Sequence, residues 1–410
     1  MALAAGSVAA LTCGYPEPGG VPSQVGGTEP EIRVGLAEGA DRVVISADSE
    51  ITVLTPNGSP IGGAPPSNGW TVVPDAGALA VVSPTGWRSA PFASLSFAAT
   101  SPAAPLVLDG RAYRGRLVVL RDPSGITAFN RVGMEAYLAG VVSAEMGRRD
   151  PSENEALAAQ AVVSRTFAIK NLGKRRSEGF DLYATVVDQV YGGIESETPQ
   201  SWQAVRETAG RVLTYQHTPI DAFFFSTCGG RTAAGTEVFA NADRPYLRSI
   251  RDVDDQGQAY CRLSPRFRWE EEWTGDQLAS ILQQTLPADA PGFKGPVDYV
   301  RDVRVTGRTG SDRVSAIAIA MSGQEVTVNG PAVRRVLRPV GDLRLLRSAT
   351  FTLTVTSTDG RLTNLRAEGS GSGHGVGFCQ WGAVGRARAG QNYSSILVAY
   401  FPGTEIERLY

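Results

Sequence analysis

The chain contains 410 residues, with 39 Lys and Arg against 41 Asp and Glu, and its formal net charge is −2. This charge argues against nucleic-acid binding as the main role, because counterion release requires a basic face. Downstream of the N-terminus, we find no run of about 18 apolar residues that would predict a membrane-spanning helix. The 47 Gly and 25 Pro exceed the average share and predict many turns, hence β-rich structure, and the length predicts two or three domains.

Residues 1–30 are predicted to be a signal-like segment followed by a tether. Residues 1–12 are mostly small and apolar, and the stretch 15–30 is rich in Pro and Gly. Cys13 follows the apolar run as in bacterial lipoproteins, in which such a thiol carries the lipid. No Lys or Arg precedes the run, and Thr12 is bulkier than the usual Gly or Ala, so a disordered N-terminus with an accidental cysteine is the alternative. The first interpretation predicts an extracytoplasmic protein whose contact with the membrane is a lipid anchor at Cys13.

The region 31–130 is predicted to be all-β. Short alternating segments are separated by turn residues, among them the dipeptide Asn57-Gly58. No catalytic cluster is evident in this region. The expected strands are 32–36, 42–46, 51–54, 106–110 and 115–120.

A helix is predicted from Val132 to Met146, because apolar residues recur there at helical spacing. Glu145 follows Leu138 by seven residues and Val141 by four, so it lies on the apolar face. A carboxylate in that position is partly desolvated, and its pKa should rise, which suits a general acid. The alternative is a buried structural glutamate paired with a nearby arginine.

A second helix is predicted over 156–172. Residues 152–155, directly after Pro151, have the spacing of a capping box, and the helix is rich in Ala. Arg165 is not obviously on the solvent face. It is expected either to form an ion pair with Glu145 or to orient the substrate or the carboxylate.

The rest of the chain mixes short helices and strands. A helix starting at Thr198-Pro199 and a strand hairpin made by 211–215 and 220–225 come first. Further elements are expected at 276–284 (helix), 304–306 and 314–319 (strands), 331–337 (helix), 351–356 (strand) and 381–389 (helix).

These patterns favour an α+β fold with a β-rich N-terminal region, a mixed α/β catalytic core and an inserted or following β-rich subdomain. The expected parts are the signal-like segment and tether (1–30), the all-β region (31–130), the first half of the core (131–265), the β-rich subdomain (266–350) and the C-terminal part of the core (351–410).

Residues 369–383 form a Gly-rich block that contains His374 and Gln380. It is not a phosphate loop, because no Lys-Ser/Thr follows at the required spacing. Such a density of Gly brings the backbone close to a ligand or permits positive φ angles.

Several ordered blocks resemble the family of stage II sporulation protein D and the amidase enhancers. Residues 135–146, EAYLAGVVSAEM, are similar to one signature of that family, and 155–168, EALAAQAVVSRTFA, to another. The resemblance extends from about Leu106 onward. Further similar blocks are 188–193, 225–230, 245–247 and 373–383.

The resemblance implies a lytic transglycosylase that cleaves the bond between N-acetylmuramic acid and N-acetylglucosamine in peptidoglycan glycan strands. Glu145 matches the family's catalytic acid, and Arg165 matches the arginine of its second helix. One glutamate suffices, because the 6-hydroxyl of the substrate is the nucleophile, and the product carries 1,6-anhydro ends. No metal or organic cofactor is implied. Residues expected to contact the substrate are Arg165, Gln160, Tyr191, His374 and Gln380.

Two other classes of function stay open. A non-catalytic glycan-binding enhancer of a separate cell-wall amidase would keep the glycan groove without the acid. A structural lipoprotein scaffold would explain the N-terminal β region but not the later blocks. Within the groove interpretation, the Gly-rich block forms a wall near Glu145 and His374 binds sugar groups; alternatively, His374 caps backbone groups in a tight turn.

The cysteines and the zinc pattern depart from the family. Some members bind zinc through Cys and His before the block at 188–193, where this chain has Tyr183, Val187 and Asp188, so we expect no zinc there. Cys379 stands where many members have Ser. Two arrangements of the remaining cysteines are open: one disulfide with a spare thiol, or a three-cysteine metal site completed by His374, formed in either case by Cys228, Cys261 and Cys379.

Overall fold

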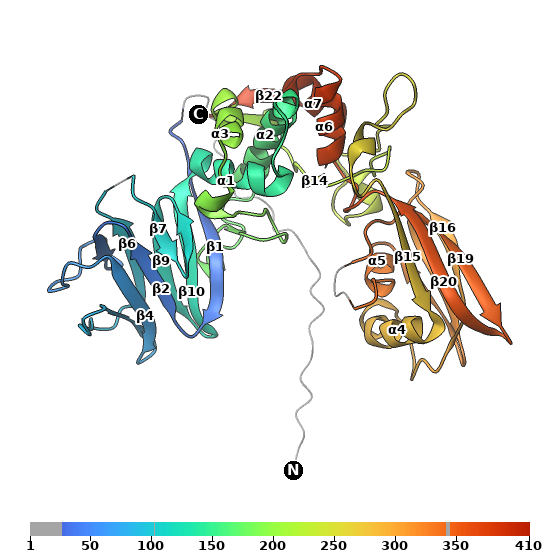
Figure 1. Cartoon of the computed structure of the whole chain (residues 1–410), viewed down its shortest axis with the longest axis horizontal. Helices are drawn as coiled ribbons and strands as arrows, with labels where there is room; N and C mark the ends of the chain where they lie inside the picture. Colours follow the sequence, from blue (N-terminus) through green and yellow to red (C-terminus); the bar gives the residue numbers. More distant parts are fainter. Residues whose placement is uncertain (1–26, 102, 342–344) are drawn as a thin grey trace, which may run out of the picture.

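The computed structural model describes residues 27–101, 103–341 and 345–410. The segment that contains Cys13 lies outside the described residues. Two β-rich parts flank a group of helices (Figure 1), and this mixture of helices and several sheets confirms the α+β fold class. Among the described residues, no helix is both long and apolar enough to cross a membrane.

The N-terminal part consists of two sheets in which nearly all neighbouring strands are antiparallel. The strands are β1 (Glu31–Ala40), β2 (Val43–Ala47), β3 (Ile51–Leu54), β4 (Gly69–Asp75), β5 (Ala78–Val82), β6 (Ser94–Ala99), β7 (Leu106–Leu108), β8 (Arg111–Tyr113), β9 (Arg116–Asp122), β10 (Gly125–Gly133) and β11 (Leu182–Tyr183). Their orders are β11-β1-β10-β9-β6-β3 and β5-β4-β2-β7-β8; β1 and β11 are parallel. The five strands expected from alternation are present as β1, β2, β3, β7 and β9, with small differences at their ends.

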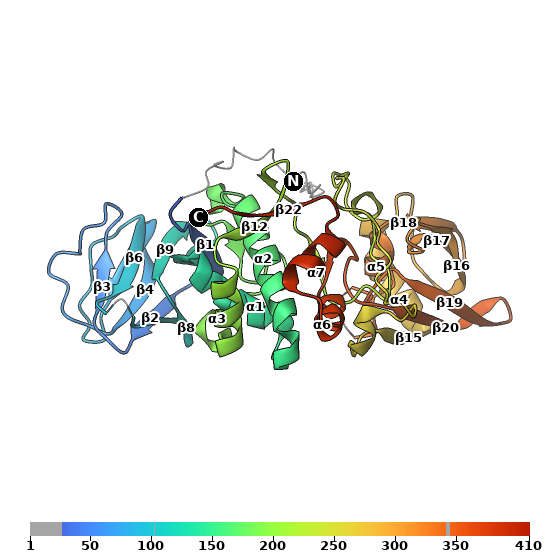
Figure 2. The same ribbon diagram turned by 90° about the horizontal axis from the view of Figure 1, so that it is seen from above.

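The helical core surrounds α2 (Asn154–Lys170), which contacts α1 (Met134–Met146), α3 (Pro199–Glu207), α6 (Gln380–Arg388) and α7 (Tyr393–Tyr400). Every residue of α2 from Ala156 to Thr166 is buried. Its small Ala side chains allow neighbours to pack on several sides, and its buried polar side chains, such as Gln160 and Arg165, form hydrogen bonds within the core. Seen from above, these helices lie between the two β-rich parts (Figure 2).

The segment before α2 differs from the expected capping box at 152–155. A short 3-10 helix (Pro151–Glu153) precedes α2, and its cap is Asp150. Asp150 Oδ1 accepts a hydrogen bond from Ser152 N–H at 3.0 Å, and Glu153 Oε2 accepts one from Asp150 N–H at 3.2 Å. The box begins two residues earlier than expected, because the fixed φ of Pro151 suits the first helical position after Asp150.

The segment after α3 departs from the expected hairpin. Strand β12 (Arg211–Tyr215) pairs with β13 (Thr218–Pro219) and with the C-terminal β22 (Glu405–Arg408). The next strand, β14 (Phe224–Phe225), instead pairs in parallel with β21 (Phe378–Cys379). This pairing brings the end of the chain against its middle. Helix α7 was not expected from the sequence.

A second unit has a hydrophobic core of its own, which includes Trp273, Leu282 and Ile317. Its elements are β15 (Arg268–Thr274), α4 (Gly275–Asp289), β16 (Val300–Arg308), β17 (Val314–Met321), β18 (Glu325–Asn329), α5 (Ala332–Val336), β19 (Phe351–Thr358) and β20 (Arg361–Ser370), in sheets β15-β20-β19 and β16-β17-β18. Phe351 and Leu365 belong to this core. The expected boundary at residue 350 is therefore wrong, since β19 and β20 complete the sheet that β15 starts.

Four more 3-10 helices lie in the connections of the core. They are Arg176–Glu178, Gly193–Ser196, Gly235–Glu237 and Tyr260–Leu263.

Candidate active site

Glu145 lies in the last turn of α1, with its side chain half-buried. Its Oε1 accepts a hydrogen bond from Val190 N–H at 2.8 Å, and its Oε2 accepts one from Gln380 Nε2 at 3.2 Å. Burial raises the pKa of the Glu145 carboxyl above its ordinary value, and the two hydrogen bonds oppose that rise. A carboxyl that holds its proton at higher pH than usual is suited to donate it to a leaving group.

A close approach at Gly140 fixes the position of α1. A Cβ there would lie 2.8 Å from the ring of Tyr191 and 3.0 Å from the backbone oxygen of Gly193. Tyr191 is buried, and its hydroxyl donates to Asn130 Oδ1 at 2.9 Å. Tyr191 thus positions the neighbouring Val190 N–H, and its expected contact with the substrate stays a prediction.

Gln380 connects the last part of the core to Glu145. It is the first residue of α6, directly after Cys379, whose Sγ accepts the N–H of Gly382 as the helix cap. Its Nε2 also lies 3.4 Å from Gln160 Oε1, and Gln160 Nε2 donates to Ser164 Oγ at 2.9 Å. Gln160 is fully buried and contacts Gln380, and its expected contact with the substrate stays a prediction.

Arg165 does not pair with Glu145. Its guanidinium is fully buried and forms a two-pronged ion pair with Glu135, with Nη2 to Oε2 at 2.6 Å and Nε to Oε1 at 2.9 Å. The remaining donors reach the Thr208 hydroxyl and the backbone oxygens of Val205 and Arg211. The expected pair with Glu145 is therefore wrong. All the donors of Arg165 bind groups of the core, and its expected contact with the substrate stays a prediction.

His374 has the alternative role that its sequence context left open, a backbone cap. Its Nε2 donates to Phe224 O at 2.8 Å, and its Nδ1 accepts from Val376 N–H at 3.1 Å. Burial among aromatic rings lowers the pKa of His374 to about 4, so the ring is neutral at pH 7. Both ring nitrogens are thus occupied by backbone groups, and the expected contact of His374 with the substrate stays a prediction.

The glycines of the Gly-rich block serve the backbone of the protein itself. Gly371 and Gly373 adopt positive φ angles of 81° and 114°. A Cβ at Gly371 would lie 2.6 Å from Thr227 O, and one at Gly373 would lie 2.7 Å from the Phe225 side chain. This part of the block is therefore a turn packed on β14, and only its end at Gln380 approaches Glu145.

The segment before Val190 is held by ion pairs. Asp188 binds Lys174 Nζ at 2.7 Å and Arg175 Nη2 at 3.2 Å, and it also accepts from Tyr183 N–H at 2.9 Å. Asp188 is therefore held by two cationic side chains and a backbone N–H. Val187, in the same turn, is 64% exposed.

Sequence reasoning missed three groups close to Glu145. One is the Val190 N–H, a backbone donor that no residue type reveals. Another is Gln189, whose Oε1 accepts from the Tyr137 hydroxyl and whose buried Nε2 has no hydrogen-bond partner among the described residues. The third is the contact between α6 and the segment that follows α1, where the Arg149 guanidinium lies 4.4 Å from the centre of the Trp381 ring.

Cys228, Cys261 and Cys379 meet in the core, as expected, and all three are buried free thiols. The Sγ atoms of Cys228 and Cys261 are 3.5 Å apart. Of the two alternatives that the sequence leaves open, the disulfide is not formed in the structure. His374 does not complete this cluster, since its ring nitrogens bind backbone groups; the buried Asp252 does.

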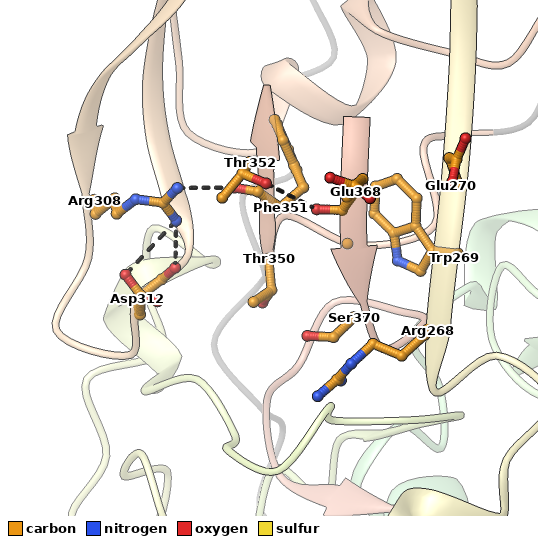
Figure 3. A pocket seen from close by; sticks show the side chains of 11 residues that line it. Arg268, Trp269, Glu270, Arg308, Asp312, Thr350, Phe351, Thr352, Glu368 and Ser370 are labelled. Carbon is orange, nitrogen blue, oxygen red and sulfur yellow. Dashed lines mark hydrogen bonds and ion pairs between the residues drawn. The ribbon is translucent and has the colours of Figure 1, made fainter. Parts of the chain in front are cut away.

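A hollow of about 720 Å³ lies in the second unit, apart from Glu145 (Figure 3). Arg308 crosses it, donating to Phe351 O at 2.8 Å and lying 3.6 Å from an oxygen of Asp312. The aromatic rings of Trp269 and Phe351 form part of its wall. Since Glu145 does not line it, this hollow is not part of the candidate active site.

Comparisons with known proteins support the relation inferred from the motifs. Residues 122–215 match the family model described as stage II sporulation protein, and residues 254–377 match a domain of unknown function. An uncharacterized protein of Brachyspira hyodysenteriae is 29% identical over 300 residues, 73% of each chain. The amidase enhancer of Bacillus subtilis is 29% identical over 283 residues, which are 62% of this chain and 38% of the enhancer.

A further relative is similar along most of its length. Stage II sporulation protein D of Bacillus subtilis is 30% identical over 298 residues, 67% of this chain and 74% of the relative. The matched residues include Glu145 within the family model. The chain therefore belongs to the stage II sporulation protein D family.

Proposed function

We propose that this protein is a lytic transglycosylase of peptidoglycan glycan strands, with Glu145 as its acid and then its base. The observation that carries the proposal is the half-buried Glu145 carboxyl, whose pKa is raised by burial and whose two oxygens are held by Val190 and Gln380. A relative named stage II sporulation protein D and one named amidase enhancer support a role at the cell wall.

In the proposed reaction, Glu145 gives its proton to the oxygen that joins N-acetylmuramic acid to N-acetylglucosamine. The bond between that oxygen and C1 of the muramic acid breaks. The 6-hydroxyl of the same sugar attacks C1 and returns its proton to Glu145. No water is consumed, and the product is a 1,6-anhydro end together with a free hydroxyl on the leaving sugar.

The hydrogen bonds of Glu145 give its two oxygens different roles. The Val190 N–H binds Oε1 at 2.8 Å, the shorter contact, so the transferable proton belongs on Oε2. Gln380 lies 3.2 Å from Oε2, and its amide carries both a donor and an acceptor. The amide can rotate, so that its NH2 group donates to the ionised carboxylate or its oxygen accepts from the protonated carboxyl. Both states occur when Glu145 acts first as acid and then as base.

A single carboxyl also distinguishes this reaction from ordinary hydrolysis. Glycoside hydrolases use two carboxyl groups, one as acid and one as base or nucleophile, about 5–9.5 Å apart. In the described part of the chain, the hydrogen-bond partners of Glu145 are Val190 and Gln380, and no neighbouring carboxylate contributes to its pKa shift. This environment favours the intramolecular attack of the 6-hydroxyl.

Mass spectrometry of digested glycan strands tests the proposal. We expect ends lighter than hydrolytic ends by one water, and we expect Glu145→Gln to lose at least about 10²-fold in rate, the usual contribution of a general acid. Glu207→Gln, at an exposed position of α3, is the matched control and should digest normally. Hydrated reducing ends, or normal digestion by Glu145→Gln, would contradict the assignment.

The second candidate is a non-catalytic enhancer of a cell-wall amidase, favoured by the relative of that name. Val186 and Val187 are 88% and 64% exposed, next to the segment that binds Glu145, and such apolar side chains suit a protein partner. Under this alternative, the purified protein leaves glycan strands intact but accelerates an added amidase, and Val186→Ser with Val187→Ser removes the acceleration while Glu145→Gln keeps it.

Either function requires access to peptidoglycan. The proposal therefore locates the protein in the periplasm or cell envelope, with Cys13 as the site of lipid attachment. Fractionation of cells that express the chain or Cys13→Ser tests this. The wild-type protein should sediment with membranes, and the variant should not.

A further inference from the structure

Four potential metal ligands converge in the core outside the candidate active site. Cys228, Asp252, Cys261 and Cys379 each offer one ligand atom, and these four atoms all lie within 4.8 Å of one another. All four side chains are at most 2% exposed. They come from the turn after β14, two later segments of the same connection and the end of β21, so folding has gathered them from distant parts of the chain.

The separations suit a tetrahedral ion. Zinc–sulfur bonds of about 2.3 Å in a tetrahedron separate neighbouring sulfurs by about 3.8 Å. Here, Cys228 Sγ and Cys261 Sγ are 3.5 Å apart, and Cys228 Sγ lies 3.2 Å from Asp252 Oδ2. A disulfide needs about 2.05 Å between the sulfurs, so the thiols are spaced as ligands rather than as a bonded pair.

Backbone donors point at the sulfurs, as they do around metal-bound thiolates. Cys379 Sγ accepts from Cys228 N–H at 3.1 Å and from Gly382 N–H at 3.3 Å, and Cys228 Sγ accepts from Gly230 N–H at 3.3 Å. Such donors stabilise sulfur that carries negative charge and offer little to a neutral thiol.

The surroundings also balance the charge of the cluster. Arg386 binds Asp252 Oδ1 through two nitrogens, at 2.9 and 3.0 Å, and leaves Oδ2 facing Cys228. Three thiolates and one carboxylate around a divalent cation carry a net charge of −2, which the guanidinium of Arg386 reduces. Unpaired, the same charges buried together would be costly.

A glycine keeps the space between two of the ligands open. A Cβ at Gly382 would lie 2.2 Å from Asp252 Oδ2 and 3.1 Å from Cys379 Sγ. Any side chain at this position would therefore fill the site from the side of α6. The hydroxyl of Tyr400, which donates to Asp252 Oδ2 at 2.8 Å, completes the enclosure.

We propose that Cys228, Cys261, Cys379 and Asp252 bind one zinc ion in a closed, four-coordinate structural site. Three thiolates and one oxygen in a tetrahedron suit zinc, and a buried site with four protein ligands leaves no position for a substrate. The site joins the turn after β14 to the cap of α6. It therefore fixes Cys379, and with it the adjacent Gln380 that holds Glu145.

Metal analysis of the purified full-length chain tests the proposal without any glycan substrate. We expect about one zinc per chain, and X-ray absorption with zinc–sulfur distances of about 2.3 Å. Cys261→Ser and Asp252→Asn should each lose most of the zinc. Cys13→Ser, the same replacement at the fourth cysteine of the chain, is the matched control and should keep it.

A second measurement uses the wild-type protein, so that the test does not depend on whether the variants fold. Adding a strong chelator to the wild-type protein should release the zinc, expose three reactive thiols and lower the melting temperature. A zinc-free protein with a Cys228–Cys261 disulfide, seen as linked peptides lighter by two hydrogens, would overturn the proposal. A zinc-free protein whose three thiols react freely would overturn it as well. Neither result bears on glycan cleavage, which is measured separately.

Discussion

Gln380 Nε2 donates to Glu145 Oε2 at 3.2 Å, although the two residues are 235 positions apart in the chain. Glu145 lies in the last turn of α1, and Gln380 is the first residue of α6. The candidate acid is thus completed only when the last part of the core has folded back on the first. The parallel pairing of Phe225 with Cys379 holds the two parts together one residue away from Gln380.

Glu145→Gln should stabilise the fold at neutral pH. Because burial raises the pKa of folded Glu145, its contribution to stability is complete below the ordinary glutamate pKa of about 4.3 and is lost as the pH rises through the folded pKa. Gln carries no charge at any pH and can still accept from Val190 N–H. The melting temperature at pH 7 should rise by about 2–4 °C for each kcal/mol gained.

The same comparison below pH 4 is its control, because Glu145 is then protonated in both the folded and the unfolded state. The difference in melting temperature should vanish there. A Gln variant that melts lower than the wild type at pH 7 would show that the charge of Glu145 stabilises the fold.

Gln380→Ala should shift the pH profile of glycan cleavage upward. Gln380 donates to the Glu145 carboxylate and thereby lowers its pKa, so removing the donor raises that pKa further. Activity requires the protonated acid and should therefore persist to higher pH in the variant, even if its maximum rate falls. The measurement is kcat/KM against pH, with Gln203→Ala, at an exposed position of α3, as the control. If the alkaline limb of the kcat/KM profile stayed at the same pH in the variant, Gln380 would not influence the pKa of Glu145.

Arg165→Met should destabilise the protein strongly. It leaves Glu135, whose side chain is 16% exposed, without its buried partner, and breaking such a pair costs about 3–5 kcal/mol. Urea denaturation measures the loss, and Arg206→Met, at an exposed position of α3, should change little. If Arg165→Met kept the wild-type midpoint but lost glycan binding, Arg165 would belong to the substrate site after all.

His374→Ala should lower the melting temperature with little effect on glycan binding. The ring caps Phe224 O and Val376 N–H, and leaving such groups unpaired costs about 1–3 kcal/mol. The control is His217→Ala, which removes a histidine whose side chain is 82% exposed. If His374→Ala bound glycan more weakly but kept the wild-type melting temperature, His374 would be a glycan-binding residue.

The pH dependence of this variant gives a second readout. The pKa of folded His374 is about 4, below the ordinary value of about 6.5, so the contribution of His374 to stability is present above the ordinary value and is lost as the pH falls through about 4. The wild-type melting temperature should therefore fall faster than that of His374→Ala between pH 6.5 and pH 4.

Local patterns predicted the elements, and long-range partners had to come from the structure. The period of apolar residues indicated α1 and the desolvated position of Glu145, since both depend on neighbours along one helix. The partner of Arg165 was misassigned to Glu145, because a helix pattern gives the face of a residue but not which carboxylate of a neighbouring helix it meets. Glu135, ten residues earlier on α1, is that carboxylate.

Two other features were beyond pattern reasoning for different reasons. Asp252 lies in a connection without periodicity, so no spacing relates it to the three cysteines. His374 was assigned to a ligand because its glycine-rich surroundings suggested an open backbone. The positive φ angles at Gly371 and Gly373 were foreseeable, but the strand that they pack against, β14, was expected in a hairpin with β12.

The chain leaves the core for the second unit and returns from it at directly paired positions, Arg268 opposite Ser370 in β15 and β20. The two ends of the unit are thus held at the spacing of neighbouring strands, whatever lies between them. Lengthening or shortening the exposed turn at Asp359 and Gly360 leaves that spacing unchanged, and the unit has a hydrophobic core of its own. The junction therefore sets where the chain enters and leaves the unit, and further contacts fix the unit against the core, with Ser311 N–H donating to Glu237 Oε1 at 3.1 Å and Arg313 Nη2 donating to Arg231 O at 3.2 Å.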